Sequence, residues 1–252
     1  AFQSAAKAAL SGGYDIVVLD GVLDLVLKDL ISVNEILKLI REKAMHVELL
    51  LTGSDSVNEI LEKAHLVTEM KVHRETPSAH GGLVEVVTGR GKGKTTYCLG
   101  KALLMSSAGV PSFMLQIIKS PRLYGEVMAS QNVPGMQIQS MGKGLVGKRN
   151  PDVNTDHKEA AREAWRRAKE IVTSRRYGLV VLDEINIAVN YGFISPEELL
   201  DLIATIPKEL RLMLSGRYAH PEIVDAAALA VEMKEIKHPY KIGVKARKGI
   251  EY

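Results

Sequence analysis

Short apolar runs alternate with longer amphipathic segments over the last two thirds of the chain. These apolar runs are interpreted as strands buried on both faces of a sheet; they cover residues 83–88, 112–118, 136–140, 179–183 and 210–215. Residues 157–175 predict a helix, because one stripe carries Ala160, Ala161, Ala164, Trp165, Ala168 and Ile171. We therefore expect an α/β fold with a doubly wound, mainly parallel sheet.

The same pattern occurs a second time, near the start of the chain. When the sequence is shifted by 163 residues, Tyr14–Asp20 lies on Tyr177–Asp183, and about 22 of 58 paired positions are identical without a gap. Capping boxes that begin helices recur at the same offset, as Ser32 with Glu35 and Ser195 with Glu198. The start of the chain is therefore interpreted as a second copy of the back half of a larger unit.

A polar segment separates the copies. Residues 73–82 carry Pro77 and the pair Gly81-Gly82, as linkers commonly do. The 252 residues are thus expected to contain a half-copy at 1–72, a linker at 73–82 and a complete unit at 83–252.

The clearest chemical motif follows the first strand of the complete unit. TGRGKGKTT joins an apolar strand to an apolar helical segment, the setting of a phosphate-binding P-loop, although Thr88 replaces the usual first glycine. Glycines at every second position let backbone N–H groups turn toward phosphate oxygens. We expect Lys94 to reach the phosphates and the Thr95 hydroxyl to ligate Mg²⁺. The predicted nucleotide-binding residues are Gly89, Arg90, Gly91, Lys92, Gly93, Lys94, Thr95 and Thr96.

A later strand ends in two carboxylates. Asp183 and Glu184 follow an apolar run, and a carboxylate there can hold Mg²⁺ near the P-loop threonine. Arg217 follows another strand at the sheet edge where ligands bind, and its guanidinium can stabilise a polyphosphate. By themselves these features indicate an ATP or GTP binder and leave the reaction open.

Composition narrows the class of protein. Apolar residues make up 46% and charged residues 25%, and the net charge of +3 is too small to indicate a nucleic-acid partner. Neither a membrane span nor a signal peptide is visible, so we expect a cytoplasmic protein without a membrane partner. The single cysteine, Cys98, excludes an internal disulfide and is expected to be a buried apolar residue. The chain begins at Ala1 without an initiator Met, which is typical of a processed or trimmed product.

Together the motifs resemble those of the P-loop family of ATP:corrinoid adenosyltransferases. The resemblance covers essentially all of 83–252, and residues 1–72 resemble the back half of the same domain. It rests on Thr88–Thr96, Val181–Ala188 with Tyr191-Gly192, Ser215–Arg217, Glu232–Tyr240 and Gly243–Tyr252. The resemblance implies a P-loop nucleoside triphosphatase (RecA-like) fold, with ATP, Mg²⁺ and a corrinoid (cobalamin or a precursor) bound.

The implied reaction is a transfer, not a hydrolysis. Cobalt(I) of a reduced corrinoid attacks the 5′ carbon of ATP, the whole triphosphate leaves, and the family binds ATP reversed in its P-loop. The substrate supplies the nucleophile, so the protein needs none of its own. The resemblance assigns catalysis to Lys94, Glu184 and Arg217, the metal to Thr95, Asp183 and Glu184, and further binding contacts to Asn186 and Leu145.

One segment departs from the family pattern. Where the family has Met-Gly-Glu-Gly-Phe-x-Trp, with aromatic rings packed under the corrin, this chain has MGKGLVG at 141–147. Leu145 can still pack against the ring, but Gly147 cannot replace an indole and Lys143 reverses a charge. The departure predicts either a different corrinoid, such as a precursor without the lower base, or a weakened activity.

The half-copy departs further from the family. The site residues Glu184, Asn186 and Arg217 are matched there by Gly21, Leu23 and Ser54. The half-copy keeps the apolar positions and the caps, which predicts a scaffold and not a second active site. Because the family is dimeric, we expect a dimer, or an intramolecular pseudo-dimer in which the half-copy takes part of the partner's place.

Two other functions are also compatible with the sequence. Leu145 and Gly147 are compatible with an ATP- and corrinoid-binding carrier or sensor that has lost catalysis. A generic P-loop phosphotransferase would release ADP or phosphate in place of triphosphate. If the protein is a transferase, a reductase must supply cobalt(I). The sequence identifies neither that electron donor nor the preferred corrinoid.

Overall fold

A computed structural model describes residues 1–77, 82–122, 124–144, 151–239 and 243, with only the path of the helix given for 151–154. The chain forms two compact units, Ala1–Val67 and Thr68–Tyr252. The strands of the second unit are β3 (Val67–Glu75), β4 (Leu83–Thr88), β5 (Ser112–Gln116), β6 (Met136–Ser140), β7 (Leu179–Asp183), β8 (Arg211–Ser215) and β9 (Leu229–Lys237). Its helices are α5 (Lys94–Ser107), α6 (Gly125–Ser130), α7 (Pro151–Thr173), α8 (Ile185–Asn190), α9 (Pro196–Ala204) and α10 (Pro221–Ala226).

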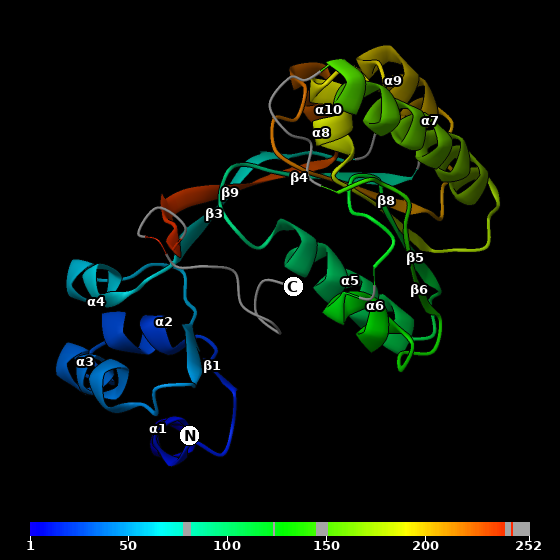
Figure 1. The fold of residues 1–252 in the computed structure, drawn as a ribbon. Helices are drawn as coiled ribbons and strands as arrows, with labels where there is room; N and C mark the ends of the chain where they lie inside the picture. Colours follow the sequence, from blue (N-terminus) through cyan, green and yellow to red (C-terminus); the bar gives the residue numbers. More distant parts are fainter. Residues whose placement is uncertain (78–81, 123, 145–150, 240–242, 244–252) are drawn as a thin grey trace. The chain divides into compact units, whose positions relative to one another are not determined.

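The strands of the second unit form one sheet, in the order β3-β9-β4-β8-β7-β5-β6 (Figure 1). The described pairs from β9 to β6 are parallel. The strand β8 lies between the P-loop strand β4 and β7, which ends in Asp183. Because parallel strands end at the same edge of a sheet, the segments after β4, β5, β7 and β8 meet at one edge.

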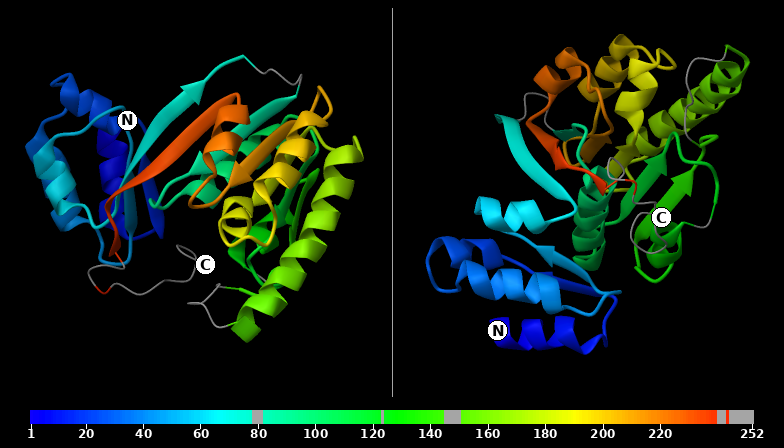
Figure 2. Two further views of the ribbon diagram at one scale, coloured as in Figure 1. Left: turned by 90° about the horizontal axis from the view of Figure 1, so that it is seen from above. Right: turned by 60° about the vertical axis from the view of Figure 1, so that its left-hand side comes forward.

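Helices cover both faces of this sheet (Figures 1 and 2). On one face, α7, α8, α9 and α10 pack on the strands, and the predicted stripe of α7 is buried around Trp165. On the other face, α5 packs on the strands through Cys98 and Ala102. Cys98 is fully buried, as expected. The predicted doubly wound, mainly parallel α/β fold is confirmed.

Several predicted boundaries and one burial pattern were wrong. β6 was expected to be buried on both faces, but it is the last strand of the sheet and is only half-buried. β5 ends at Gln116, two residues early, because the chain turns toward the segment after β6. The helix predicted at 157–175 runs from Pro151 to Thr173; its polar first turn gave no apolar signal, although proline favours a helix start. β3 continues to Glu75, into residues assigned to the linker, and lies beside β9.

The first unit repeats the back half of the second, element by element. It consists of α1 (Phe2–Ser11), β1 (Ile16–Leu19), α2 (Val22–Leu27), α3 (Val33–Glu42), β2 (Glu48–Leu51) and α4 (Asn58–Lys63). The sequence offset carries the bounds of α2 onto those of α8, and the bounds of α4 onto those of α10. β1 and β2 pair in parallel with Ile16 beside Glu48, and β7 and β8 pair with Leu179 beside Arg211, so the register is repeated as well.

Both predicted capping boxes are present. At α3, Ser32 accepts the Glu35 N–H, and the Glu35 side chain accepts the Ser32 N–H. Ser195 and Glu198 do the same at α9. Each box satisfies two backbone donors that the first turn of a helix otherwise leaves unpaired. Among the described helices, none combines the length and the apolar composition that a membrane crossing requires.

Candidate functional site

A glycine-rich loop joins β4 to α5 at the carboxyl edge of the sheet. Gly89 has φ 93°, and a Cβ at this position would overlap the Met233 carbonyl oxygen of β9. A Cβ on Gly91 would lie 2.7 Å from the same oxygen, which already accepts the Gly91 N–H at 2.7 Å. The close approach of β9 therefore requires glycine at both positions. Gly93, at the N-cap of α5, has open space where a Cβ would stand, which leaves room for a ligand.

Lys94 begins α5 and turns its side chain back over the loop. Its Nζ donates a hydrogen bond to the Gly91 carbonyl oxygen at 2.6 Å. Burial, and then the nearby Arg217 guanidinium, lower the pKa of Lys94 to about 8, although two carboxylates oppose the shift. A bound anion offsets the cost of burying the charged lysine and weakens the repulsion between Lys94 and Arg217. This arrangement therefore favours the binding of a polyanion.

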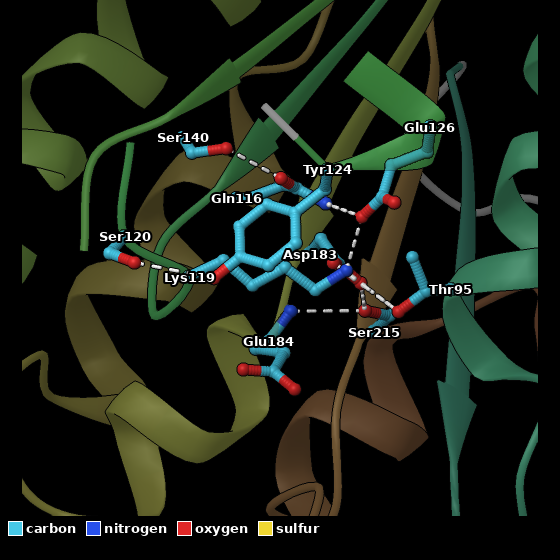
Figure 3. A network of polar contacts seen from close by, with 10 residues as sticks. All are labelled: Thr95, Gln116, Lys119, Ser120, Tyr124, Glu126, Ser140, Asp183, Glu184 and Ser215. Atoms are coloured by element: carbon cyan, nitrogen blue, oxygen red, sulfur yellow. Dashed lines mark hydrogen bonds and ion pairs between the residues drawn. The ribbon is translucent and has the colours of Figure 1, made fainter. Parts of the chain in front are cut away.

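The Thr95 hydroxyl faces Asp183 at the end of β7. Thr95 Oγ1 donates to Asp183 Oδ1 at 3.0 Å and lies 3.3 Å from Oδ2. Asp183 is fully buried and also accepts a hydrogen bond from Ser215 Oγ at 2.6 Å (Figure 3). Two hydroxyl donors from different elements thus fix the orientation of this carboxylate.

Glu184 is the N-cap of α8 and adopts the left-handed conformation, with φ 64° and ψ 20°. Its N–H donates to Ser215 Oγ at 3.0 Å, and its carboxylate points away from that contact (Figure 3). Burial, and then the neighbouring Asp183 carboxylate, raise the pKa of Glu184 to about 7; Lys119 is the foremost cation that opposes the shift. The carboxylate is therefore placed where an added cation or hydrogen-bond donor stabilises its charged form.

Arg217 lies in a strained turn after β8. The residues on either side, Gly216 and Tyr218, have φ 127° and 63°. The Ala219 N–H donates to Thr88 Oγ1 at 3.3 Å, so the threonine that replaces the usual first P-loop glycine ties the loop to this turn. The Arg217 side chain is exposed to solvent, where it can meet a phosphate.

Asn186 is placed differently from the other predicted residues. It is fully buried, and its Nδ2 donates to the carbonyl oxygens of Leu214 at 3.4 Å and Gly216 at 3.3 Å. These bonds tie α8 to the turn that carries Arg217. The contact with substrate that we expected for Asn186 stays a prediction.

A polar cluster that we did not predict lies after β5. Lys119 Nζ is 2.5 Å from Glu126 Oε1, which also accepts from Gln116 Nε2 at 3.1 Å (Figure 3). Gln116 in turn accepts from Ser140 Oγ at 2.6 Å. Lys119 also lies over the Tyr124 ring, 5.5 Å from its centroid. The sequence carried a signal for this cluster, since Gln116 interrupts an apolar strand and Lys119 follows that strand at the ligand-binding edge.

The segment expected to face the corrinoid starts on the same turn. The Gly142 N–H donates to the Lys119 carbonyl oxygen at 2.8 Å, and the Gly144 N–H donates to the Ile118 carbonyl oxygen at 2.8 Å. A Cβ on Gly142 would overlap the Ile118 carbonyl group, so only glycine fits. The remaining residues of the expected corrinoid contact, Leu145 and Gly147, and the C-terminal residues 244–252 lie outside the described part of the chain.

The residues at this edge fit a hydrated Mg²⁺ ion. Within the described residues, no cluster of three or more His, Cys, Asp or Glu side chains could hold a metal by itself. Mg²⁺, however, commonly uses one or two protein oxygen ligands together with phosphates and water. Thr95, Asp183 and Glu184 present hard oxygen atoms beside the loop. The structure thus brings Lys94, Thr95, Asp183, Glu184 and Arg217 to one edge, where they can bind and stabilise a magnesium-bound polyphosphate.

Known proteins resemble this chain in sequence and in fold. The family model described as "ATP:corrinoid adenosyltransferase BtuR/CobO/CobP" matches the chain in two pieces, residues 1–79 and 80–252. A corrinoid adenosyltransferase of Sinorhizobium sp. is 34% identical over 183 residues, which cover 70% of this chain and 83% of that protein. An uncharacterized protein of Nostoc sp. is 29% identical over 262 residues, which cover 98% of this chain and 69% of that protein. Among solved structures, a KaiC-like protein of Pyrococcus horikoshii OT3 matches 66% of this chain and 82% of its own, with a TM-score of 0.41 and 15% identity.

Proposed function

The chain belongs to the ATP:corrinoid adenosyltransferases BtuR/CobO/CobP, and from this premise we propose how its residues serve the transfer. The enzyme transfers the 5′-deoxyadenosyl group of ATP to a corrinoid. The main support is that two cations, Lys94 of the P-loop and Arg217 of the turn after β8, meet the carboxylates Asp183 and Glu184 at one sheet edge.

In the proposed reaction, the electron pair of cobalt(I) forms the cobalt–carbon bond at C5′ of ATP. The bond between C5′ and its oxygen breaks, and the electron pair leaves with the triphosphate. No proton has to move in this step, so the protein needs no general acid or base. Its tasks are to hold C5′ open to the corrinoid and to stabilise the departing polyanion.

We assign these tasks to named groups. Lys94 exchanges its bond to the Gly91 carbonyl oxygen for a phosphate oxygen, and Arg217 approaches the phosphates from the turn after β8. Thr95, Asp183 and Glu184 would hold Mg²⁺, and Asp183 also orients the threonine hydroxyl. When bound, Mg²⁺ supplies positive charge that stabilises the triphosphate as it leaves.

We further propose that the half-copy at 1–72 is a scaffold without an ATP site. Gly21 and Ser54 occupy the positions of Glu184 and Arg217, and the Ser54 N–H is bonded to Asp24 Oδ1 at 2.8 Å, so this turn is closed by its own side chains. We also propose that the protein is cytoplasmic and that a reductase supplies cobalt(I). The chain is proposed to form a dimer or an intramolecular pseudo-dimer.

Titration of the full chain with ATP and Mg²⁺ tests these assignments. The wild type is expected to bind one ATP per chain. Lys94→Met is expected to weaken binding and to lower the rate of adenosyl transfer by about a hundredfold or more, because it removes a charge at the departing polyanion. Lys101→Met, on the same helix, removes a cation that lies over Tyr97 and is expected to leave both quantities within about twofold.

Three outcomes would contradict the assignments. Two ATP molecules per wild-type chain would give the half-copy a site of its own. An unchanged transfer rate in Lys94→Met would show that Lys94 takes no part in the reaction. ATP binding without transfer to any corrinoid would favour a carrier or sensor.

A further inference from the structure

The Ser215 hydroxyl at the end of β8 joins two groups of the site. Ser215 Oγ donates to Asp183 Oδ1 at 2.6 Å and accepts the Glu184 N–H at 3.0 Å (Figure 3). A hydroxyl has one donor and two acceptor positions, so both bonds form at once. Ser215 and Asp183 are each 1% exposed or less, so water does not compete for these bonds.

Glu184 needs such a bond because of its backbone conformation. At φ 64° it occupies the left-handed region. This conformation is unfavourable for any residue that carries a Cβ, so the surroundings must offset its cost in free energy. The bond from its N–H to Ser215 holds this conformation. In this conformation the carboxylate points away from Ser215 (Figure 3), and Lys119, Lys94 and Arg217 lie near enough to favour its charged form.

The half-copy repeats the arrangement without the chemistry. Thr52 Oγ1 donates to Asp20 Oδ1 at 2.6 Å and accepts the Gly21 N–H at 2.8 Å. Gly21 has φ 70° and ψ 9°, close to the values of Glu184. These three residues correspond to Ser215, Asp183 and Glu184 at the offset of 163. The pair of hydrogen bonds therefore forms without the P-loop threonine and without the glutamate. We infer that its role is to fix the backbone conformation of the turn.

We propose that Ser215 is a positioning residue for adenosyl transfer, which acts by fixing the left-handed turn that aims the Glu184 carboxylate at the magnesium-bound nucleotide. The proposal deepens the proposed function and rests on it for the role of Glu184. A threonine at position 215 serves equally, because Thr52 makes the same two bonds in the half-copy.

A double-mutant cycle on ATP binding tests whether Ser215 acts through Glu184. The full chain is compared as wild type, Ser215→Ala, Glu184→Ala and the double variant, and the dissociation constant for ATP is measured in the presence of Mg²⁺. Ser215→Ala is expected to weaken binding by about tenfold in the wild-type background and by less than about twofold when Glu184 is already alanine. Equal losses in the two backgrounds would overturn the proposal.

Ser215→Thr is the matched rescue variant. It is expected to bind ATP and to transfer the adenosyl group within about threefold of the wild type, and to unfold at the same temperature. A loss as large as that of Ser215→Ala would overturn the proposal even if both variants fold. Adenosyl transfer by the wild type is assayed in parallel, so that a failure of the proposed function is distinguished from a failure of the role of Ser215. Absence of transfer would contradict the proposed function, while the cycle still measures the coupling of Ser215 to Glu184.

Discussion

At the scale of single residues, Glu184 shows where sequence reasoning succeeds and where it stops. The pair Asp183-Glu184 at the end of an apolar strand predicted a carboxylate site, and the structure places both beside the P-loop. The left-handed backbone of Glu184 could not be predicted, because its residue type gives no sign of it. Gly21, its counterpart in the half-copy, was the available hint.

Glu184→Gly is expected to separate stability from activity. Glycine adopts the left-handed conformation without a Cβ penalty, and the change removes a half-buried carboxylate beside Asp183. The free energy of unfolding should rise by about 1 kcal/mol, while adenosyl transfer is lost. Urea denaturation and a transfer assay measure the two effects. A variant less stable than the wild type would show that the conformation carries no strain.

The cluster around Lys119 escaped prediction for a different reason. Its charge is matched by Glu126 across a turn, and neither residue belongs to a motif that the sequence displays. Burial raises the pKa of Glu126, but hydrogen bonds from Lys119 and Gln116 outweigh it, so the pKa lies below its usual value.

This lowered pKa predicts the pH dependence of stability. A carboxyl group with a lower pKa in the folded state adds stability above its unfolded pKa of about 4.3, and this stability is lost as the pH falls through the folded value. Glu126→Gln should therefore reduce the free energy of unfolding at pH 7 and flatten its decline below about pH 4.3. Glu170→Gln, in an exposed pair with Arg167, is the control. An unchanged pH profile in Glu126→Gln would contradict the assignment.

At the scale of elements, local signals placed most helices and strands. The Ser-x-x-Glu spacing located the starts of α3 and α9, and largely apolar runs located the central strands β4 and β7. The edge position of β6 could not be derived, because strand order depends on contacts far apart in the sequence. The same holds for the turn after β5, which carries Lys119 and supports Gly142.

Gly142→Ala tests the packing of that turn. The added Cβ would overlap the Ile118 carbonyl group, so the two segments must move apart, at a cost of about 1–3 kcal/mol in stability. Thermal or urea unfolding provides the measurement. Gly100→Ala inside α5 is the matched control, since its Cβ meets no atom within 4 Å and alanine favours a helix by up to about 1 kcal/mol. Equal stability of the two variants would contradict the described packing.

At the scale of the whole molecule, a single offset explains most of the organisation. The repeat was visible in the sequence because the apolar positions of β1 and β2 match those of β7 and β8, and the structure repeats their register. At the same offset the half-copy keeps Asp20 in the place of Asp183, while Gly21 and Ser54 stand in the places of Glu184 and Arg217. The structural boundary between the units, after Val67, was not predictable, because β3 looks like part of the half-copy in sequence yet lies beside β9.

The most direct test of the central claim is the identity of the phosphate product. The full chain is incubated with ATP, Mg²⁺ and chemically reduced cobalamin or cobinamide, and the adenosylated corrinoid and the phosphate products are quantified together. Attack at C5′ predicts one inorganic triphosphate for each cobalt–carbon bond formed, with no ADP. Release of ADP or monophosphate that does not depend on the corrinoid would contradict the account and indicate a phosphotransferase or hydrolase.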